Sequence, residues 1–293
     1  MHHKIIKFAL MTIEQIYTDF INQLKSIYEE REAGNITDWI FESVAGLKRL
    51  ERITNKQNSL DVSTIKLLND KLEQLLQHKP VQYVLQEAWF YKMKFFVNNA
   101  VLIPRPETEE LVEWGVYELK NKNEKVKIID IGTGSGCIAI ALKKELKGAD
   151  ILAIDISEDA LAVAKRNALT LHANIQFLEI DFLDETIWHQ LPLFDIIVSN
   201  PPYIPENDKI KMEKNVTDYE PHLALFVNDF DPFIFYRKIA LFAQLHLNNP
   251  GKIYVEVQEE YADEVKKIFE QHGLSSLVKK DIYAKDRMVS ARW

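Results

Sequence analysis

Two stretches, Asp130-Ile-Gly-Thr-Gly-Ser-Gly136 and Ser199-Asn-Pro-Pro-Tyr203, decide the predicted fold of this chain. Each follows a short apolar run rich in β-branched residues, 125–130 in the first case and 194–199 in the second, and such runs are typical of buried strands. In an open α/β sheet, ligands bind beyond the carboxyl ends of the parallel strands. We therefore expect both stretches at one edge of a sheet, one holding a cofactor and the other a substrate.

Strands and helices alternate around these two stretches. The predicted strands lie at 126–131, 151–155, 175–180, 194–199 and 252–257, with two short ones near 276–282 and 287–292. The predicted helices lie at 137–146, 158–171, 233–247 and 260–272. Repeated alternation of this kind predicts an α/β fold with a doubly wound, mostly parallel sheet and right-handed crossovers.

The N-terminal part of the chain has a helical pattern instead. Apolar residues over 13–28 recur at the spacing of one helix face, and Gly34-Asn35 is expected to end that helix. Thr37 or Asp38 can cap a second helix, and a third follows a turn at Asn58-Ser59. Short loops between such helices predict a small bundle.

The chain therefore separates into three predicted parts. Residues 1–79 form the helical bundle, which is either a stability cap, a lid or a module that docks a partner protein, with 1–10 as a poorly ordered extension. Residues 80–103, rich in aromatic and β-branched side chains, predict a β-hairpin that links two domains. Residues 104–293 hold the alternating pattern, and Thr108 can open their first helix.

Composition narrows the class of protein. The formal net charge of −8 argues against a protein that wraps a long phosphate backbone. Cys137 is the single cysteine, which excludes an internal disulfide and a multi-cysteine metal site. No apolar stretch approaches the roughly 20 residues of a membrane span. The histidines are scattered and show no spacing typical of metal ligands, so we expect no metal. With a single cysteine, we expect a cytoplasmic protein in which Cys137 is a small core residue.

The glycine-rich stretch is expected to bind a cofactor. Glycines at a strand-to-helix turn allow positive φ angles and close approach of the backbone to a ligand. The dinucleotide fingerprint needs G-x-G-x-x-G, but here the third glycine comes one residue early and Cys137 takes its place. G-x-G-x-G after an acid is the pattern of methyltransferases that use S-adenosyl-L-methionine (SAM). The alternative is a tight turn that binds nothing.

Acidic residues at the ends of three successive predicted strands strengthen the cofactor interpretation. Asp130 ends the first strand, and Asp155 ends the second, where a carboxylate can accept both ribose hydroxyls. Asp181 with Phe182 ends the third, and this pair suits the exocyclic amine and the ring of an adenine. The predicted cofactor site therefore comprises Asp130, Gly132, Thr133, Gly134, Ser135, Gly136, Asp155, Asp181, Phe182 and Asn200.

The Asn-Pro-Pro-Tyr stretch is expected to hold the substrate and carry the chemistry. The Asn200 side-chain oxygen and the Pro201 carbonyl can each accept an N–H of a planar nitrogen, which orients its lone pair and stabilises developing positive charge. Pro202 stiffens the loop, and Tyr203 offers a flat face for stacking. A structural Pro-Pro turn is the alternative. Asn200, Pro201 and Tyr203 are the predicted catalytic residues, with Pro202 added for substrate binding.

Several segments together closely resemble one family, the protein-(glutamine-N5) methyltransferases of the HemK/PrmC type, which modify translation release factors. The resemblance covers nearly the whole chain. It is carried by Pro80-x-Gln-Tyr83, Ile103-Pro-Arg-Pro-Glu-Thr-Glu109, Asp130–Gly136, Asp155-Ile-Ser157, Asn200-Pro-Pro-Tyr-Ile204, Tyr219-Glu-Pro-His-Leu-Ala-Leu225 and Lys285-Asp-Arg-Met-Val289. The Asn-Pro-Pro-Tyr motif alone is shared with methyltransferases that act on nucleic-acid amines.

The resemblance implies a seven-stranded class I SAM-dependent methyltransferase domain behind a small all-α domain. It implies methyl transfer to the glutamine of the Gly-Gly-Gln loop in class 1 release factors, with S-adenosyl-L-homocysteine as the other product. Asn200 and Pro201 would hold the glutamine amide, while 132–136, Asp155 and Phe182 would hold SAM. We expect a monomer that binds the release factor without direct contact to nucleic acid or membrane.

Other functions remain open on the sequence. Methylation of a ribosomal-protein glutamine would use the same pocket, although Pro104–Thr108 favours release factors. An amino-methyltransferase acting on DNA or RNA bases fits poorly with the acidic charge. A SAM-binding scaffold without catalysis would need a broken motif, and none is present. Two residues depart from the family, Gln86 and Lys92, each standing where a glycine is usual in the hairpin region.

Overall fold

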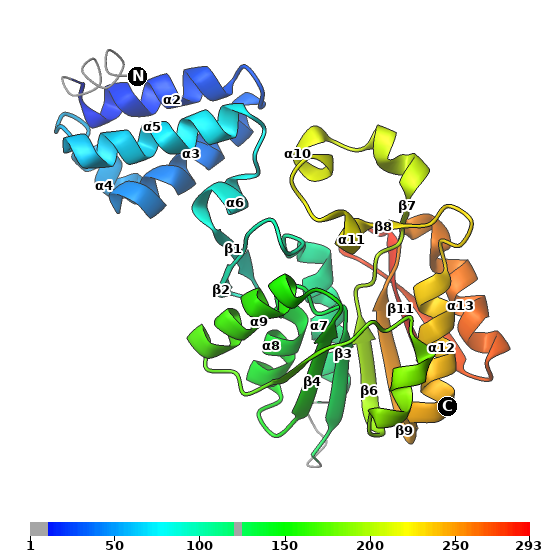
Figure 1. The fold of residues 1–293 in the computed structure, drawn as a ribbon. Helices are drawn as coiled ribbons and strands as arrows, with labels where there is room; N and C mark the ends of the chain where they lie inside the picture. The colour runs from blue at the N-terminus through cyan, green and yellow to red at the C-terminus, as the bar shows by residue number, and fades with distance from the viewer. Residues whose placement is uncertain (1–10, 120–124) are drawn as a thin grey trace. The chain divides into compact units, whose positions relative to one another are not determined.

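The computed structural model describes residues 11–119 and 125–293, and the chain divides into two compact units (Figure 1). The first unit holds the chain up to Gln86 together with Lys214–Tyr219. The second holds Glu87–Glu213 and Glu220–Trp293. The division thus falls at Gln86, inside the linker predicted at 80–103, and the expected extension at 1–10 lies outside the described residues.

The first unit is helical. Its core contains aromatic residues from two helices, Phe20 and Phe41, whose rings meet edge to face with centroids 5.6 Å apart. Thr12 begins the first helix with a capping box, in which its hydroxyl accepts from the Gln15 amide and the Gln15 side chain accepts from the Thr12 amide. The helices are α2 (Ile13–Leu24), α3 (Glu30–Ala45), α4 (Arg49–Thr54), α5 (Val62–Leu76) and α6 (Val81–Leu85).

The predicted ends of the first two helices are wrong. The first helix already stops at Leu24, and α3 runs straight through Gly34-Asn35, which were expected to end it. Thr37 and Asp38 lie inside α3 rather than at its cap. The buried Thr37 donates its hydroxyl to the carbonyl of Ala33, one turn earlier. Burial of the apolar face of α3 outweighs the low helix propensity of glycine and asparagine.

The predicted hairpin is shorter than expected. Residues 81–85 are helical rather than extended, and the strands are β1 (Glu87–Phe90) and β2 (Met93–Phe96). The hairpin turns at Tyr91-Lys92, whose φ angles are 49° and 61°. Asn167 of α9 (Glu158–Thr170) fixes β2, because it accepts from the Phe96 amide (2.7 Å) and donates to the Phe96 carbonyl (2.9 Å).

A seven-stranded sheet forms the centre of the second unit, in the order β10-β11-β9-β6-β3-β4-β5 (Figure 1). All neighbours from β9 to β5 are parallel, and β11 pairs antiparallel with β9 and β10. This confirms the predicted doubly wound, mostly parallel sheet. The strands are β3 (Lys127–Ile131), β4 (Asp150–Asp155), β5 (Gln176–Glu179), β6 (Phe194–Ser199), β9 (Leu247–Glu256), β10 (Ser275–Lys280) and β11 (Asp286–Arg292).

Helices cover both faces of this sheet. Alternate residues of one strand serve the two sides: Ile129 packs into a core with α12 (Ile234–His246) and α13 (Ala262–Gln271), and Ile128 packs into a second core with α7 (Pro106–Leu119) and α8 (Cys137–Glu145). The strands are apolar on both faces, as expected for a buried parallel sheet. The parallel strands β3, β4, β5, β6 and β9 therefore all end at the same edge of the sheet, where ligands bind in such folds.

Among the described residues, no helix has the length and apolar character needed to cross a membrane.

Short elements complete the second unit outside the sheet. The short elements are η1 (Glu185–Gln190), β7 (Ile204–Pro205), η2 (Glu206–Lys211), α11 (His222–Leu225), β8 (Phe226–Val227) and η3 (Glu259–Tyr261), while α10 (Lys214–Thr217) belongs to the first unit.

Candidate active site

The glycine-rich turn lies between β3 and α8 in a conformation that requires glycine. Gly132, Gly134 and Gly136 have φ angles of 71°, 53° and 79°. A Cβ at Gly136 would lie 3.2 Å from the Cβ of Ala164, so this glycine lets α8 pack closely on α9. A Cβ at Gly132 or Gly134 would meet nothing within 4 Å, so these two leave free space beside the backbone.

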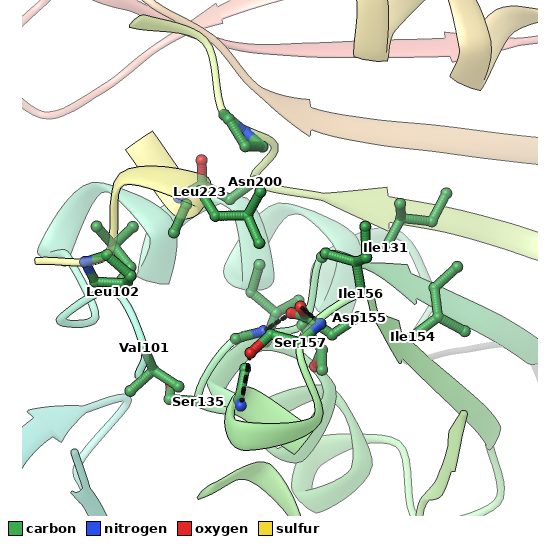
Figure 2. Close-up of a pocket in the computed structure, with 18 of the residues that line it drawn as sticks. Val101, Leu102, Ile131, Ser135, Ile154, Asp155, Ile156, Ser157, Asn200 and Leu223 are labelled. Atoms are coloured by element: carbon green, nitrogen blue, oxygen red, sulfur yellow. Dashed lines mark hydrogen bonds between the residues drawn. The ribbon is translucent and has the colours of Figure 1, made fainter. Parts of the chain in front are cut away.

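That free space belongs to a pocket at the carboxyl edge of the sheet (Figure 2). Figure 2 shows Ser135 from the glycine turn, Asp155 and Ser157 from the end of β4, and Asn200 from the end of β6 around it. The predicted site residues that line the pocket are Gly132, Thr133, Gly134, Ser135, Asp155, Asp181, Phe182, Asn200 and Pro202. The structure thus brings both motif stretches to one site, as the strand pattern predicts.

Asp155 is held ready to accept further hydrogen bonds. Its two oxygens accept from the backbone amides of Gly134 (2.8 Å) and Ser157 (3.0 Å), which leaves a second lone pair on each. Burial raises the pKa of the Asp155 carboxyl. A carboxylate that presents two oxygens to a pocket from a strand end suits a vicinal diol such as that of a ribose.

Asp181 and Phe182 lie on the same wall. Asp181 accepts from the Leu183 amide (2.9 Å) through one oxygen, and its other oxygen can serve a ligand. The Phe182 ring stacks on Trp188 with centroids 5.3 Å apart and also lines the pocket. The buried hydroxyl of Ser135 has no partner among the described residues, so a polar ligand group would complete it. These donors and acceptors, with the open glycine turn, fit an adenosine bearing an amino acid.

Four predicted site residues do not line the pocket. The fully buried Asp130 accepts from the Thr133 hydroxyl (2.7 Å) beneath the glycine turn, and burial raises its pKa to about 7. Gly136 packs between helices. The other two are Pro201 and Tyr203, which follow Asn200 in the loop. Each of these four is adjacent in the chain to a residue that lines the pocket.

The Asn200 side chain is anchored from below. Its Nδ2 donates to Thr108 Oγ1 (3.2 Å), and Thr108 in turn donates to Glu256 Oε2 (2.6 Å). Tyr203 also donates to Glu256, through its hydroxyl (3.4 Å). The hydroxyl of Ser199 donates to the Ile131 carbonyl (2.7 Å), which ties the end of β6 to the end of β3. Asn200 Oδ1 therefore remains as an acceptor at the pocket.

Two further segments, which sequence reasoning did not assign to the site, also line the pocket. One precedes α7 and the other covers the start of α11; their lining residues are Ala100, Val101, Leu102, Pro104 and Arg105, and Pro221, Leu223 and Ala224. The buried Glu220 joins them, because it accepts from Arg105 (2.6 Å) and from the Ile103 amide (3.2 Å). The sequence contains both Pro104–Thr108 and Tyr219–Leu225, two motifs of the resemblance, and their joint occurrence could have indicated this contact.

Sequence reasoning also missed the polar support of Asn200. Thr108 was expected to open a helix, but α7 begins at Pro106 and the Thr108 hydroxyl points into the core. Glu256 stands between valines in a buried strand, and a charge there was the available signal. Cys137 lies buried, and burial raises the pKa of its thiol to about 12, which fits the predicted small core residue.

A parallel sheet extended by an antiparallel strand, with a glycine turn after one strand and a pocket at its edge, defines a class I SAM-dependent methyltransferase. The chain matches the family profiles described as PrmC N-terminal domain over residues 15–85 and Methyltransferase small domain over residues 116–218. The solved hMettl16 catalytic domain, in complex with an RNA hairpin, shares the fold at a TM-score of 0.53. It is 19% identical and covers 68% of this chain and 74% of that one.

Sequence relatives identify the family. A release factor glutamine methyltransferase from Flavobacterium psychrophilum is 43% identical over 286 residues, which cover 97% of this chain and all of the relative. Another from Bacteroides thetaiotaomicron is 40% identical over 94% of this chain and 98% of the relative. The chain therefore belongs to the release factor glutamine methyltransferase family, and its cofactor is SAM. The resemblance inferred from the sequence is confirmed.

Proposed function

We propose that this protein transfers a methyl group from SAM to the side-chain nitrogen N5 of the glutamine in the Gly-Gly-Gln loop of class 1 release factors. Relatives that carry the name release factor glutamine methyltransferase match almost the whole chain. The observation that carries the proposal is the Asn200 side chain, anchored through Nδ2 so that Oδ1 is left to accept an amide N–H at the pocket.

The cofactor would be held by the strand ends already described. Asp155 would accept the ribose hydroxyls, and Asp181 with Phe182 would contact the adenine. Gly132 and Gly134 leave space for the methionine part. When bound, SAM supplies an electrophilic methyl group to this pocket.

The loop after β6 would hold the substrate amide. An amide nitrogen is a weak nucleophile, because its lone pair is delocalised into the carbonyl. Asn200 Oδ1 and the Pro201 carbonyl each accept one N–H, which turns the lone pair toward the methyl group and stabilises positive charge on nitrogen. Pro201 and Pro202 restrict the loop so that this carbonyl keeps its direction. Tyr203 would pack against the planar amide.

We infer that the helical unit docks the release factor and that the enzyme works as a cytoplasmic monomer. A glutamine in a loop can enter a small pocket, but selection of one protein needs contacts beyond that loop. Light scattering of the purified protein checks the monomer directly. A dimer that persists on dilution would contradict this part alone.

Label transfer tests the reaction. SAM with a labelled methyl group is incubated with a purified class 1 release factor, its loop Gln→Ala variant, and duplex DNA. We expect label on the unaltered factor only, and mass spectrometry should place it on the loop glutamine. Equal labelling of the Gln→Ala variant, or labelling of DNA, would overturn the proposed substrate.

A further inference from the structure

Glu256 is a buried carboxylate for which the proposed chemistry has no direct use. It lies at the end of β9 with 2% of its surface exposed, and β6 and β11 hold the strand on both sides. Tyr236 donates its hydroxyl to the Glu256 carbonyl (3.0 Å), which fixes the backbone further. Burying a carboxylate is costly unless its hydrogen bonds are made, so this group calls for an explanation.

Its two oxygens hold the two polar side chains of the Asn-Pro-Pro-Tyr loop. Oε2 accepts from Thr108, which accepts from Asn200, and Oε1 accepts from Tyr203. One rigid carboxylate therefore supports the first and the last residue of the loop. These partners come from α7, β9 and the loop after β6, so their contact is tertiary and not local.

The Thr108 hydroxyl determines which way the Asn200 amide faces. A hydroxyl has a single proton to donate, and an ionised carboxylate can only accept. While Glu256 is ionised, Thr108 must give its proton to Glu256 and can only accept from Asn200. The NH₂ group of Asn200 must then face Thr108, and Oδ1 must face the pocket.

We propose that Glu256 and Thr108 are positioning residues that lock the Asn200 amide with its oxygen toward the substrate glutamine. The proposal rests on the proposed function, in which Asn200 Oδ1 accepts an N–H of that glutamine. With the amide reversed, Asn200 would present a donor to a donor, and the lone pair of the substrate nitrogen would lose its orientation.

Protonation of Glu256 removes the lock. A neutral Glu256 can donate to Thr108, and Thr108 can then donate to Asn200 Oδ1, so the reversed amide becomes possible. Burial and the nearby Glu107 raise the pKa of Glu256 to about 7, opposed by hydrogen bonds from Thr108 and Tyr203 and by the charge of Arg287. The titratable groups that face Glu256 are Glu107 on α7, Cys137 on α8, Tyr203, Tyr236 on α12 and Arg287 on β11.

A direct test observes the Asn200 amide without catalysis. Protein labelled with ¹⁵N-asparagine is titrated between pH 5.5 and 8.5, and the Asn200 NH₂ signals are assigned by their absence from an Asn200→Ser spectrum. We expect these signals to shift with one titration in the unaltered protein and to stay constant in Glu256→Gln. The proposal would be overturned if the Asn200 NH₂ signals did not change with pH in the unaltered protein, or if they titrated equally in Glu256→Gln.

Kinetics with the release factor give an independent test. Thr108→Val keeps the side-chain shape but removes the hydroxyl, and we expect kcat to fall roughly 10- to 100-fold, as for a mispositioned group, with SAM affinity within a few-fold. Thr108→Ser restores the hydroxyl and should restore most of kcat. Glu256→Gln should lower kcat several-fold and flatten the acidic limb of its pH profile. Melting temperatures establish that each variant is folded.

The outcomes separate the two proposals. Unchanged kcat and pH profile in Thr108→Val and Glu256→Gln, while the unaltered enzyme methylates the release factor, would overturn the lock and leave the proposed function standing. An unaltered enzyme that labels no release factor would overturn the proposed function. The NMR titration would still decide whether Glu256 sets the Asn200 amide.

Discussion

At the scale of single residues, the site depends on carboxylates that the fold buries at a cost. Burial raises the pKa of both Asp130 and Glu256 to about 7. A folded-state pKa above the unfolded value means that folding is favoured by the protonated form, so stability is lost as the pH rises from about 4 to 7. The ionised form of Glu256, which would lock Asn200, therefore contributes less to the stability of the folded protein than the protonated form does.

Asp130→Asn tests this linkage. The wild-type contribution from Asp130 should fall by roughly 2–3 kcal/mol between pH 5 and 8, while asparagine titrates nowhere in that range and still accepts from Thr133. Urea unfolding at both pH values measures the free energy of unfolding. The variant should gain stability relative to wild type as the pH rises. Parallel losses in the two proteins would show that Asp130 is not the titrating group.

Asp155→Asn tests the assignment of the ribose site. Loss of a charged acceptor costs about 1.5–3 kcal/mol, so SAM binding measured by calorimetry should weaken roughly 10- to 100-fold. Asp159→Asn removes an exposed carboxylate from the first turn of α9 and serves as the matched control, with unchanged affinity expected. Equal affinities in all three proteins would remove Asp155 from the site.

The sequence was sufficient to place the site residues at the ends of strands. It was not sufficient to find the residues whose hydrogen bonds hold them in position. Asp155 and Asn200 follow buried strands, so the fold class alone places them at the shared edge. Thr108 and Glu256 are separated by 148 positions, and nothing in either local pattern indicates their contact. Such a hydrogen bond depends on how α7 packs on β9, which a single sequence does not reveal.

At the scale of elements, the backbone conformation explains the two departures from the family pattern, Gln86 at the end of α6 and Lys92 in the hairpin turn. Gln86 and Lys92 have φ angles of 58° and 61°, in the left-handed region where glycine avoids a steric cost. The hairpin forms in spite of this, held by its cross-strand pairs and by Asn167. The left-handed backbone at Gln86 and Lys92 would thus favour glycine for steric reasons and not for the chemistry of the site.

Lys92→Gly should stabilise the protein. A non-glycine residue in the left-handed region costs about 1–2 kcal/mol, and the added flexibility of glycine offsets part of the gain, so we expect about 0.5–1 kcal/mol. Lys92→Ala removes the same long side chain but keeps the Cβ, and it should give no gain. Chemical denaturation compares the three. Equal gains from both variants would locate the effect in the lysine side chain instead.

Element prediction succeeded in the sheet and failed among the N-terminal helices for one physical reason. A buried strand such as β6 is a short apolar run with sharp ends, and its bounds at Phe194–Ser199 were predicted correctly. A helix on the surface of a bundle has weak local ends. In α3, packing of Ile36 and Ile40 into the core carries the helix past Gly34-Asn35.

At the scale of the whole molecule, the helical unit has exposed apolar residues that its own fold does not use. Helix α4 buries none of its residues, and Leu50 and Ile53, one turn apart, are 75% and 51% exposed. Arg52 between them is engaged by Asp38 (2.8 Å), which fixes the orientation of the helix. An apolar pair on a firmly held helix suits contact with a partner protein.

The double variant Leu50→Asp/Ile53→Asp tests this docking. Burial of two such side chains contributes about 1.5–3 kcal/mol each at most, so we expect KM for an intact release factor to rise tenfold or more. The kcat/KM for a short Gly-Gly-Gln peptide should stay unchanged, because the peptide reaches only the pocket. Leu169→Asp, on α9 and 79% exposed, is the control. If KM for the factor stays at the wild-type value, or if the peptide reaction falls in parallel, the helical unit does not dock the substrate through α4.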